Sequence, residues 1–410
     1  MNRRKFISGT LLSAVAVGAG VYSYHRLIGD RFFNPCLPDN DALAKLMQQP
    51  LIKDLMANID FSKVWDGHVH LIGTGDSQSG VWVTPDMRSW SNPWQHLQFN
   101  LYMNASCIDA KKSGLDKQFI ERLASLTQTT PQGVRLLLLA FDYFYDQTGQ
   151  MKKAFSSFHT PNDYAASVAN SSPQFEWIAS VHPYRKDALI ELEKAAEKGA
   201  KAVKWLPPAM GMDPASPLCD AFYRKLVELN LPLLSHAGEE KAVHGSDTQK
   251  LGNPLLLRRP LEKGVTVIVA HCASLGMGED LDNNGVEVSN FSLFSRMMDD
   301  ANLNENLYGE ISATIQINRS EEVIKTLLSK RDWHARLLNA SDYPLPGLMP
   351  LFSLKQLARR QILAEKYVKP LSQIRLYNPW LFDFLTKRAL NWQGQQLSES
   401  IFETRRVFQE

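Results

Sequence analysis

Short apolar runs rich in β-branched residues alternate with helical segments along most of the chain. From residue 62 onward, eight of these runs have the length and composition of buried strands. They span residues 63–70, 134–142, 175–182, 202–207, 232–236, 265–271, 306–312 and 336–341. Between them lie amphipathic segments such as 186–198, where Leu189, Leu192 and Ala196 recur at helical spacing and Gly199 follows as a stop. This alternation is typical of a parallel sheet covered by helices.

Eight strand–helix units predict an α/β fold in which the sheet closes into a (β/α)8 TIM barrel. The competing fold is an open doubly wound sheet, which would carry a glycine-rich phosphate turn after its first strand. Gly73 and Gly75 match such a turn poorly. We predict a helical N-terminal extension over residues 30–61, the barrel with its C-terminal helices over 62–395, and a C-terminal tail over 396–410.

The first residues resemble a twin-arginine export signal. Arg3 and Arg4 stand before Phe6, and a weakly apolar stretch rich in Gly and Ala continues to Tyr24. Its low hydrophobicity suits that route better than a strongly apolar signal or a spanning helix, although a membrane-anchoring helix is the alternative. Residues 1–29 therefore predict the twin-arginine machinery as a partner and a periplasmic location, or attachment to the inner membrane facing the periplasm.

Composition narrows the class of protein. With 410 residues and 44% hydrophobic content, the chain can bury a large core. The 45 Lys and Arg nearly balance the 43 Asp and Glu, so no excess of cations favours nucleic acid as a partner. Four cysteines, none at CxxC spacing, are too few for a disulfide scaffold and leave the redox compartment open. We expect a small-molecule substrate, and a homodimer remains open.

Polar residues recur where the predicted strands end, which is where barrel enzymes carry their catalytic groups. His68 and His70 end the first strand and point the same way, because side chains alternate along a strand. His236 ends the fifth strand, His271 ends the sixth, and Asp342 follows the eighth. A single histidine at a strand end is more often a core residue, but the joint pattern favours a site. This nitrogen and oxygen set suits zinc or another divalent first-row ion.

These motifs resemble those of the amidohydrolase superfamily, in the branch that contains decarboxylases of the aminocarboxymuconate-semialdehyde type and dicarboxylate lactonases. The resemblance covers residues 62–390 and rests on the order of the motifs. They are Asp66-Gly-His68-Val-His70, residues 199–204, His236-Ala-Gly-Glu239, Ala270-His271, residues 306–312, Ala340-Ser-Asp342-Tyr-Pro344 and residues 378–382.

The resemblance implies a role for each strand-end residue. His68, His70 and His236 are implied as metal ligands, and Asp342 as the ligand that also takes a proton from the attacking water. His271 is implied to hold that water or the substrate oxygen. These roles agree with the chemistry of the residues, because a metal ion lowers the pKa of bound water from about 15.7 toward 7 and a nearby carboxylate completes the deprotonation.

Lys204 ends the fourth predicted strand, where some branches of the superfamily carry a carbamylated lysine that bridges two metals. Carbamylation needs a neutral amine and therefore a desolvated lysine with a lowered pKa. The alternative is a lysine that pairs with a carboxylate or with substrate. Because the overall likeness is to the mononuclear branch, we expect one divalent ion, Zn²⁺ by preference, and two only if Lys204 is carbamylated.

Several other polar or aromatic residues lie near strand ends or in the long segment 71–98, which follows the first strand and has the length of a lid. A structural hydrogen bond or ordinary packing is the alternative for each of them. The candidate substrate contacts are His182, Arg185, Glu239, His244 and Trp82, and Glu240, Tyr308, Glu310 and Ser312 are further polar groups of this kind.

The set predicts a metal-dependent hydrolase that uses a metal-activated water to cleave a C–O or C–N bond of a lactone, ester or amide. The alternative is a non-oxidative decarboxylase or hydratase of an unsaturated or aromatic carboxylic acid, which a carboxylate-binding group near the metal would favour. A binding protein that has lost activity is disfavoured, because it would have no reason to keep the four histidines together with Asp342.

Overall fold

The computed structural model describes residues 32–241, 248–303 and 305–408, so the predicted export signal lies outside the described residues. Each predicted strand region contains an observed strand. These strands are β1 (Trp65–His70), β3 (Arg135–Leu139), β5 (Phe175–Ile178), β6 (Val203–Trp205), β7 (Leu233–His236), β8 (Val267–Ala270), β11 (Leu307–Glu310) and β12 (Leu337–Leu338). Most are shorter than the apolar runs, because the runs continue into the loops that follow.

The strands form a parallel barrel. In the described part of the chain they make a three-stranded sheet, β1-β3-β5, and a five-stranded sheet, β12-β11-β8-β7-β6. Two parallel bridges join the sheet edges, Ala179 to Val203 and Val69 to Tyr343. At these seams the Ala179 amide donates to the Ala202 carbonyl at 2.9 Å and the His70 amide donates to the Tyr343 carbonyl at 2.9 Å. The predicted (β/α)8 barrel is therefore confirmed.

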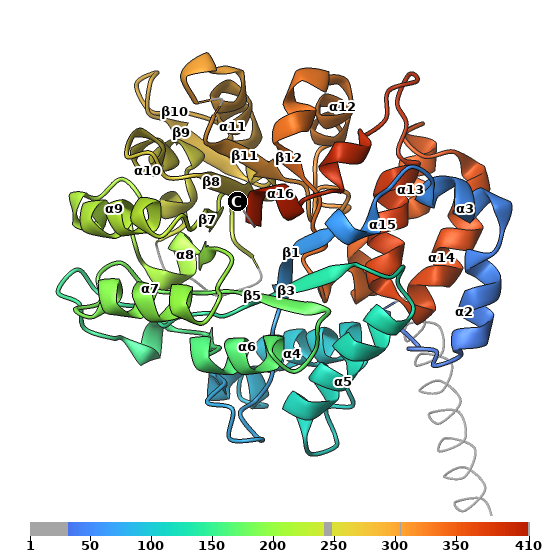
Figure 1. Ribbon diagram of the computed structural model, residues 1–410, viewed down its shortest axis with the longest axis horizontal. Coiled ribbons are helices and arrows are strands. Elements are labelled where there is room, and N and C mark those ends of the chain that lie inside the picture. The colour runs from blue at the N-terminus through green and yellow to red at the C-terminus, as the bar shows by residue number, and fades with distance from the viewer. Residues whose placement is uncertain (1–31, 242–247, 304, 409–410) are drawn as a thin grey trace, which may run out of the picture.

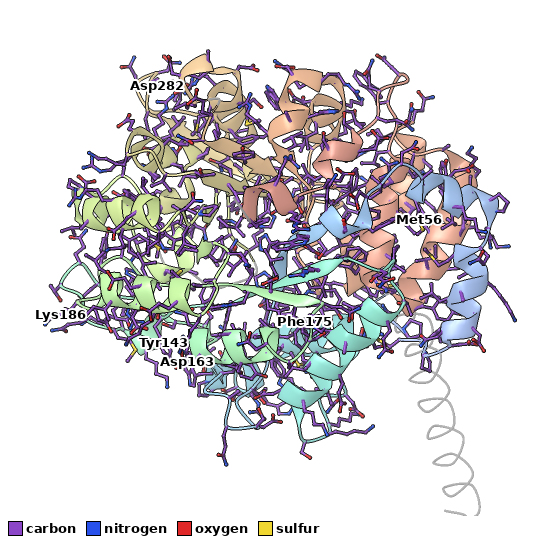
Figure 2. The ribbon with its side chains drawn as sticks, viewed as in Figure 1. Met56, Tyr143, Asp163, Phe175, Lys186 and Asp282 are labelled. Carbon is purple, nitrogen blue, oxygen red and sulfur yellow. A yellow bond between two sulfur atoms is a disulfide. The ribbon has the colours of Figure 1, made fainter. Side chains whose placement is uncertain are left out.

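Helices follow the strands and surround the barrel (Figure 1). They are α5 (Leu115–Gln128), α6 (Asn162–Ala169), α7 (Ala188–Glu197), α9 (Asp220–Glu228), α10 (Arg258–Glu262), α11 (Asn290–Asp299) and α12 (Glu321–Ser329), followed by α13 (Leu354–Arg359), α14 (Val368–Tyr377) and α15 (Pro379–Ala389). The N-terminal extension forms α2 (Asn40–Met47) and α3 (Pro50–Met56), which pack against α14 and α15. In Figure 2, charged side chains such as Asp163, Lys186 and Asp282 lie on this outer ring, exposed to solvent.

The end of the barrel at the N-termini of its strands is closed by the C-terminal segment. The helix α16 (Arg405–Phe408) lies over the middle of the ring in Figure 1. The Phe408 ring packs among inward-facing apolar side chains, which include Trp65, Leu234 and Ile268. A Cβ atom on Gly67 would lie only 2.6 Å from that ring, so β1 needs glycine at this point. Residues 396–408 are thus part of the barrel structure.

The segment after β1 crosses the other end of the barrel. It contains β2 (Trp82–Val83), which pairs with β4 (Phe158–His159), and the helix α4 (Pro93–Ala105), while α8 (Pro207–Met210) and the hairpin of β9 (Met277–Asp280) and β10 (Val286–Ser289) follow other strands. A disulfide joins Cys36 to Cys107 and ties the N-terminal extension to the end of α4. The spacing of the cysteines did not predict this pair. Among residues 32–241, 248–303 and 305–408, no helix is both long and apolar enough to cross a membrane.

Replacing Phe408 with Ala should destabilise the fold strongly, because the ring is 7% exposed and fills the end of the barrel. We expect a loss of about 3 kcal/mol in the free energy of unfolding, as for other buried phenylalanines. Urea denaturation measures it. The neighbouring Val407→Ala variant, which removes a half-buried side chain from the same helix, is the control. Equal stability of the two variants would contradict the role assigned to Phe408.

Candidate active site

Five predicted site residues meet where the strands end. His68 and His70 come from β1, His236 from β7, His271 directly follows β8, and Asp342 lies beyond β12. The ring centroid of His68 is 5.3 Å from that of His70 and 5.0 Å from that of His271. The His236 and His271 centroids are 5.2 Å apart. Oδ1 of Asp342 lies 3.0 Å from Nε2 of His70 and 3.5 Å from Nε2 of His68. The structure therefore brings this whole set together.

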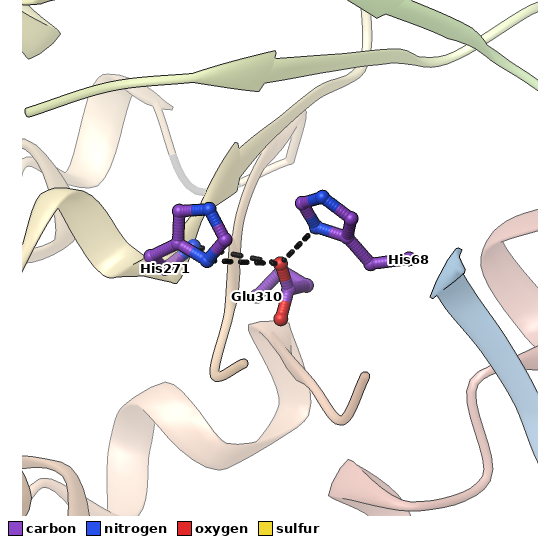
Figure 3. A group of neighbouring side chains, drawn as sticks. All are labelled: His68, His271 and Glu310. Atoms are coloured by element: carbon purple, nitrogen blue, oxygen red, sulfur yellow. Dashed lines mark hydrogen bonds and ion pairs between the residues drawn. The ribbon is translucent and has the colours of Figure 1, made fainter. Parts of the chain in front are cut away.

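A buried carboxylate holds two of these histidines in place. Nδ1 of His68 lies 2.9 Å from Oε2 of Glu310, and the Ser312 hydroxyl donates to the same oxygen at 2.9 Å. Nδ1 of His271 in turn lies 2.7 Å from the Ser312 hydroxyl oxygen. Figure 3 shows Glu310 between the two rings. With Glu310 accepting, both imidazoles carry their proton on Nδ1 and keep the Nε2 lone pair for a metal or substrate.

Another buried carboxylate, Asp66, aligns the strands that carry the site. Its Oδ1 accepts from the amides of His68 and Ser341 at 3.1 and 3.0 Å. Its Oδ2 accepts from the indole N–H of Trp380, in α15, at 2.8 Å. Asp66 therefore links the end of β1 to the chain just before Asp342, across the seam of the barrel.

The donor set fits a divalent cation. Nε2 of His236 is buried and has no hydrogen-bond partner among the described residues. Because buried polar atoms normally have a partner, this nitrogen is a candidate metal ligand. Burial lowers the pKa of His68, His236 and His271 well below the ordinary value, so these imidazoles are neutral and can coordinate. His68, His70 and Asp342 also place one ligand atom each within 4.8 Å of one another.

Two site residues have an unusual backbone conformation. His271 and Asp342 both have φ of 56°, in the left-handed region that most residues avoid. Such positions persist only where the surrounding contacts hold them, and they concentrate at functional sites. Here the conformation turns each side chain into the centre of the site, directly after β8 for His271 and four residues after β12 for Asp342.

Lys204 lies inside the barrel beside the histidines. It is 1% exposed, and its Nζ is 3.4 Å from Nε2 of His68. Burial lowers the pKa of Lys204 to about 8, so a neutral fraction of the amine exists near neutral pH. This is the property that carbamylation requires.

A sequence model of the amidohydrolase family matches residues 65–370. The chain belongs to the amidohydrolase family. This family is metal-dependent, so the cluster of histidines and carboxylates is a candidate metal site of an enzyme. Among curated protein sequences, none matches the chain.

Solved structures that are similar to this chain include three bacterial proteins. The first is a candidate 2-pyrone-4,6-dicarboxylic acid hydrolase from Pseudomonas putida, with 13% identity over 83% of this chain and 97% of its own, and a TM-score of 0.43. The second is 4-oxalomesaconate hydratase from Rhodopseudomonas palustris, with 12% identity, 84% and 95% coverage and a TM-score of 0.42. The third is 5-carboxyvanillate decarboxylase from Sphingomonas paucimobilis, with 10% identity, 76% and 95% coverage and a TM-score of 0.43.

The cavity of this amidohydrolase has two lobes that share His236, His271 and Asp342. The apolar lobe reaches toward the segment after β1, and the polar lobe opens beside the segment after β11. Residues lining the apolar lobe include Leu71, Val81, Val83, Phe99, Met103 and Phe158. The other lobe is named the polar lobe for its charged and amide side chains, although apolar residues such as Trp94, Leu97 and Leu351 also line it. Its polar residues include Glu239, Lys241, Gln316, Asn318 and Arg319.

Three predicted substrate contacts lie away from this cavity. Nε2 of His182 is 2.9 Å from the Met210 carbonyl and its Nδ1 accepts from the Tyr184 amide, so both ring nitrogens are used by the backbone. The Arg185 guanidinium donates to Asp142 at 3.0 Å. Trp82 packs near the Tyr143 ring, and its neighbours Val81 and Val83 face the cavity instead, as strand alternation dictates.

The two remaining predicted substrate contacts are Glu239 and His244. Glu239 lines the polar lobe and forms an ion pair with Lys241 at 3.2 Å. His244 lies outside the described residues.

Sequence reasoning missed three polar residues of this site, Arg319, Gln316 and Tyr102, and left the role of a fourth, Glu310, undecided. For Glu310 the sequence left a substrate contact or a structural hydrogen bond open, and the structure shows the second, because Glu310 holds His68 and, through Ser312, His271. Arg319 and Gln316 enter the polar lobe, and Tyr102 of α4 lies where the two lobes meet. A sequence signal for Gln316 and Arg319 did exist. The polar run that contains them follows the seventh predicted strand, in a loop position where barrel enzymes place functional groups.

The amidohydrolase should bind its metal less tightly when Glu310 is replaced with Gln. The amide can no longer accept equally from His68 and Ser312, so the two rings lose their fixed orientation. We expect a loss of metal affinity of about 10- to 100-fold, as for other residues that orient metal ligands. Zinc titration against a competing chelator measures it. Glu239→Gln, at the cavity rim, should leave the affinity unchanged, and equal affinity of Glu310→Gln and wild type would refute the assignment.

Proposed function

We propose that this amidohydrolase is a metal-dependent hydrolase that cleaves a C–O or C–N bond of a small molecule, such as a lactone, ester or amide. The observation that carries the proposal is the position of Asp342, whose Oδ1 lies within 3.5 Å of Nε2 of both His68 and His70. A carboxylate in that place can both bind a cation and accept a proton from the attacking water.

In this proposal the side chains of the site have different tasks. A divalent ion held by His68, His70, His236 and Asp342 would make water more acidic and polarise the substrate carbonyl. Asp342 accepts the proton of the attacking water and returns it to the leaving group. His271, fixed through Nδ1 by Ser312, presents Nε2 to the water or to the substrate oxygen.

We propose one metal ion per chain, Zn²⁺ by preference, because histidine nitrogens and a carboxylate oxygen are typical zinc ligands. Lys204 provides the alternative of a second ion if its amine is carbamylated, and its full burial supports a neutral amine. Metal content per chain separates the two arrangements.

A second candidate is a non-oxidative decarboxylase or hydratase of an unsaturated or aromatic carboxylic acid. The specific support is Arg319, a cation that enters the same cavity as His236, His271 and Asp342. Metal analysis of the purified protein, combined with a panel of lactones, aryl esters and anilides, tests the primary proposal. Chelator-sensitive hydrolysis that zinc restores would support it. Carbon dioxide release from aromatic acids, without hydrolysis of the panel, would replace it with the second candidate.

Two histidine variants separate metal binding from chemistry. His271→Asn should keep nearly one equivalent of metal while turnover falls by about 10²- to 10⁴-fold, because it removes a group that acts on the water or the oxyanion. His236→Asn should lose metal as well, because its Nε2 has no other partner among the described residues. Metal content and turnover are measured on the same samples. Two equivalents in wild type and one in His271→Asn would make His271 a ligand of a second ion.

We also propose that the enzyme works in the periplasm after twin-arginine export, either free or attached to the inner membrane. The Cys36–Cys107 disulfide supports an oxidising compartment, because such bonds are rare in the reducing cytoplasm. The twin arginines at positions 3 and 4 support the route.

Replacing both Arg3 and Arg4 with Lys should retain the protein in the cytoplasm, because the paired guanidinium groups distinguish this signal from others. Fractionation of cells that express the double variant measures the distribution. The variant Lys5→Arg, with the pair intact, is the control. Unchanged periplasmic delivery of the double variant would point to another route or to a simple anchor.

A further inference from the structure

Two polar side chains without partners enter the polar lobe from one loop. Gln316 and Arg319 lie between β11 and α12, where the Arg319 amide donates to the Gln316 carbonyl at 3.1 Å. This turn brings both side chains to the lobe that His236, His271 and Asp342 also line. The pair therefore adjoins the candidate metal site.

The Arg319 guanidinium is buried, and the carboxylates of Asp342, Glu240 and Glu239 act on it electrostatically without forming an ion pair in the described part of the chain. The residue is 9% exposed, and within the described part of the chain its side chain makes no hydrogen bond or ion pair. Nε of Arg319 and Nε2 of Gln316 are both buried donors without an acceptor. A buried charge without an ion-pair partner is costly. Burial lowers the pKa of Arg319 to about 10, although the negative charges of Asp342, Glu240 and Glu239 act in the opposite direction.

The carboxylates in this region have nearer partners than Arg319. Glu239 pairs with Lys241 at 3.2 Å, Glu240 lies 3.5 Å from Nδ1 of His236, and Asp342 lies 3.0 Å from His70. A divalent ion bound at Asp342 would offset the negative charge of that carboxylate further. The protein thus leaves the guanidinium available for an anion that comes from outside.

We propose that Arg319 and Gln316 bind the carboxylate of the substrate, which is a monocarboxylic acid with an apolar body. A guanidinium presents a planar pair of N–H donors that matches a carboxylate, and the Gln316 amide adds a third donor. The apolar lobe then receives the rest of the molecule. Among the described residues that line the apolar lobe, Lys204 is the only lysine or arginine, and it lies against His68. These residues therefore offer no outer cation for a second carboxylate.

This subsite rests on the proposed active site but not on the bond that is cleaved, so it is tested by binding. The probes are benzoate and its uncharged analogue benzamide, titrated calorimetrically into the full chain loaded with zinc and again after metal removal. We expect the wild type to bind benzoate at least 10-fold more tightly than benzamide in both states. Benzoate affinity that requires zinc and does not depend on Arg319 would place the carboxylate on the metal and overturn the proposal.

The variants isolate the guanidinium. Arg319→Met should lose at least 10-fold in benzoate affinity and leave benzamide unchanged, and Arg319→Lys should recover only part of the loss, because one ammonium cannot replace the paired donors. Lys186→Gln removes a positive charge from the outer ring, away from both lobes, and should stay within a factor of two of wild type. Equal losses for benzoate and benzamide in Arg319→Met would mean a damaged cavity and would refute the subsite.

Gln316→Leu provides a second measurement if Arg319→Met does not fold. It should weaken benzoate several-fold without weakening benzamide, and an unchanged benzoate affinity there would count against the subsite. A protein that binds benzoate through Arg319 but hydrolyses no member of the panel would refute the hydrolase and leave the subsite standing.

Discussion

The arrangement of the site depends on one buried carboxylate, Glu310. It is 2% exposed, and its neighbours along β11 cannot move without breaking the barrel. By accepting from His68 and from Ser312, it fixes the rotation and the tautomer of two imidazoles that come from different strands. Burial raises the pKa of Glu310 to about 7, so the group is costly to keep charged. That cost is offset by the hydrogen bonds that converge on it.

The site also depends on the closure of the barrel. Donors on β1, β7 and β8 reach one another only because the strands run parallel and end at the same edge. Asp66 reinforces this geometry at the seam, where it bonds to the amides of His68 and Ser341 and to the indole of Trp380. The helix α15 is therefore connected to the site through the indole of Trp380 and through Lys387, whose Nζ donates to the Ala340 carbonyl at 2.6 Å. Packing outside the barrel thus contributes to the alignment inside it.

The sequence was sufficient to predict the features that follow from local periodicity. The strands were found because apolar runs alternate with helical segments, and His68, His70, His236, His271 and Asp342 were found because they stand at the strand ends. The same reasoning did not place His182 correctly, although His182 lies as far beyond β5 as Asp342 lies beyond β12. The difference lies in the contacts of the loop: the His182 amide donates to Asp142, and both ring nitrogens bond to backbone groups, which hold the ring away from the cavity. The polar run that contains Gln316 and Arg319 indicated a loop near the site, but not which side chains enter the cavity. The Cys36–Cys107 pair depends on a long-range contact that no local pattern encodes.

The left-handed backbone at His271 and Asp342 has a consequence for how relatives of this chain diverge. Asn, Asp, His and Gly are the residues that adopt positive φ with least strain. A lineage that abandoned the metal would still be under steric selection to keep one of these four residues at each position. Retention of His271 or Asp342 in a distant homologue is therefore weaker evidence of preserved chemistry than retention of His68 or His236, which lie in strands where many side chains would fit the backbone.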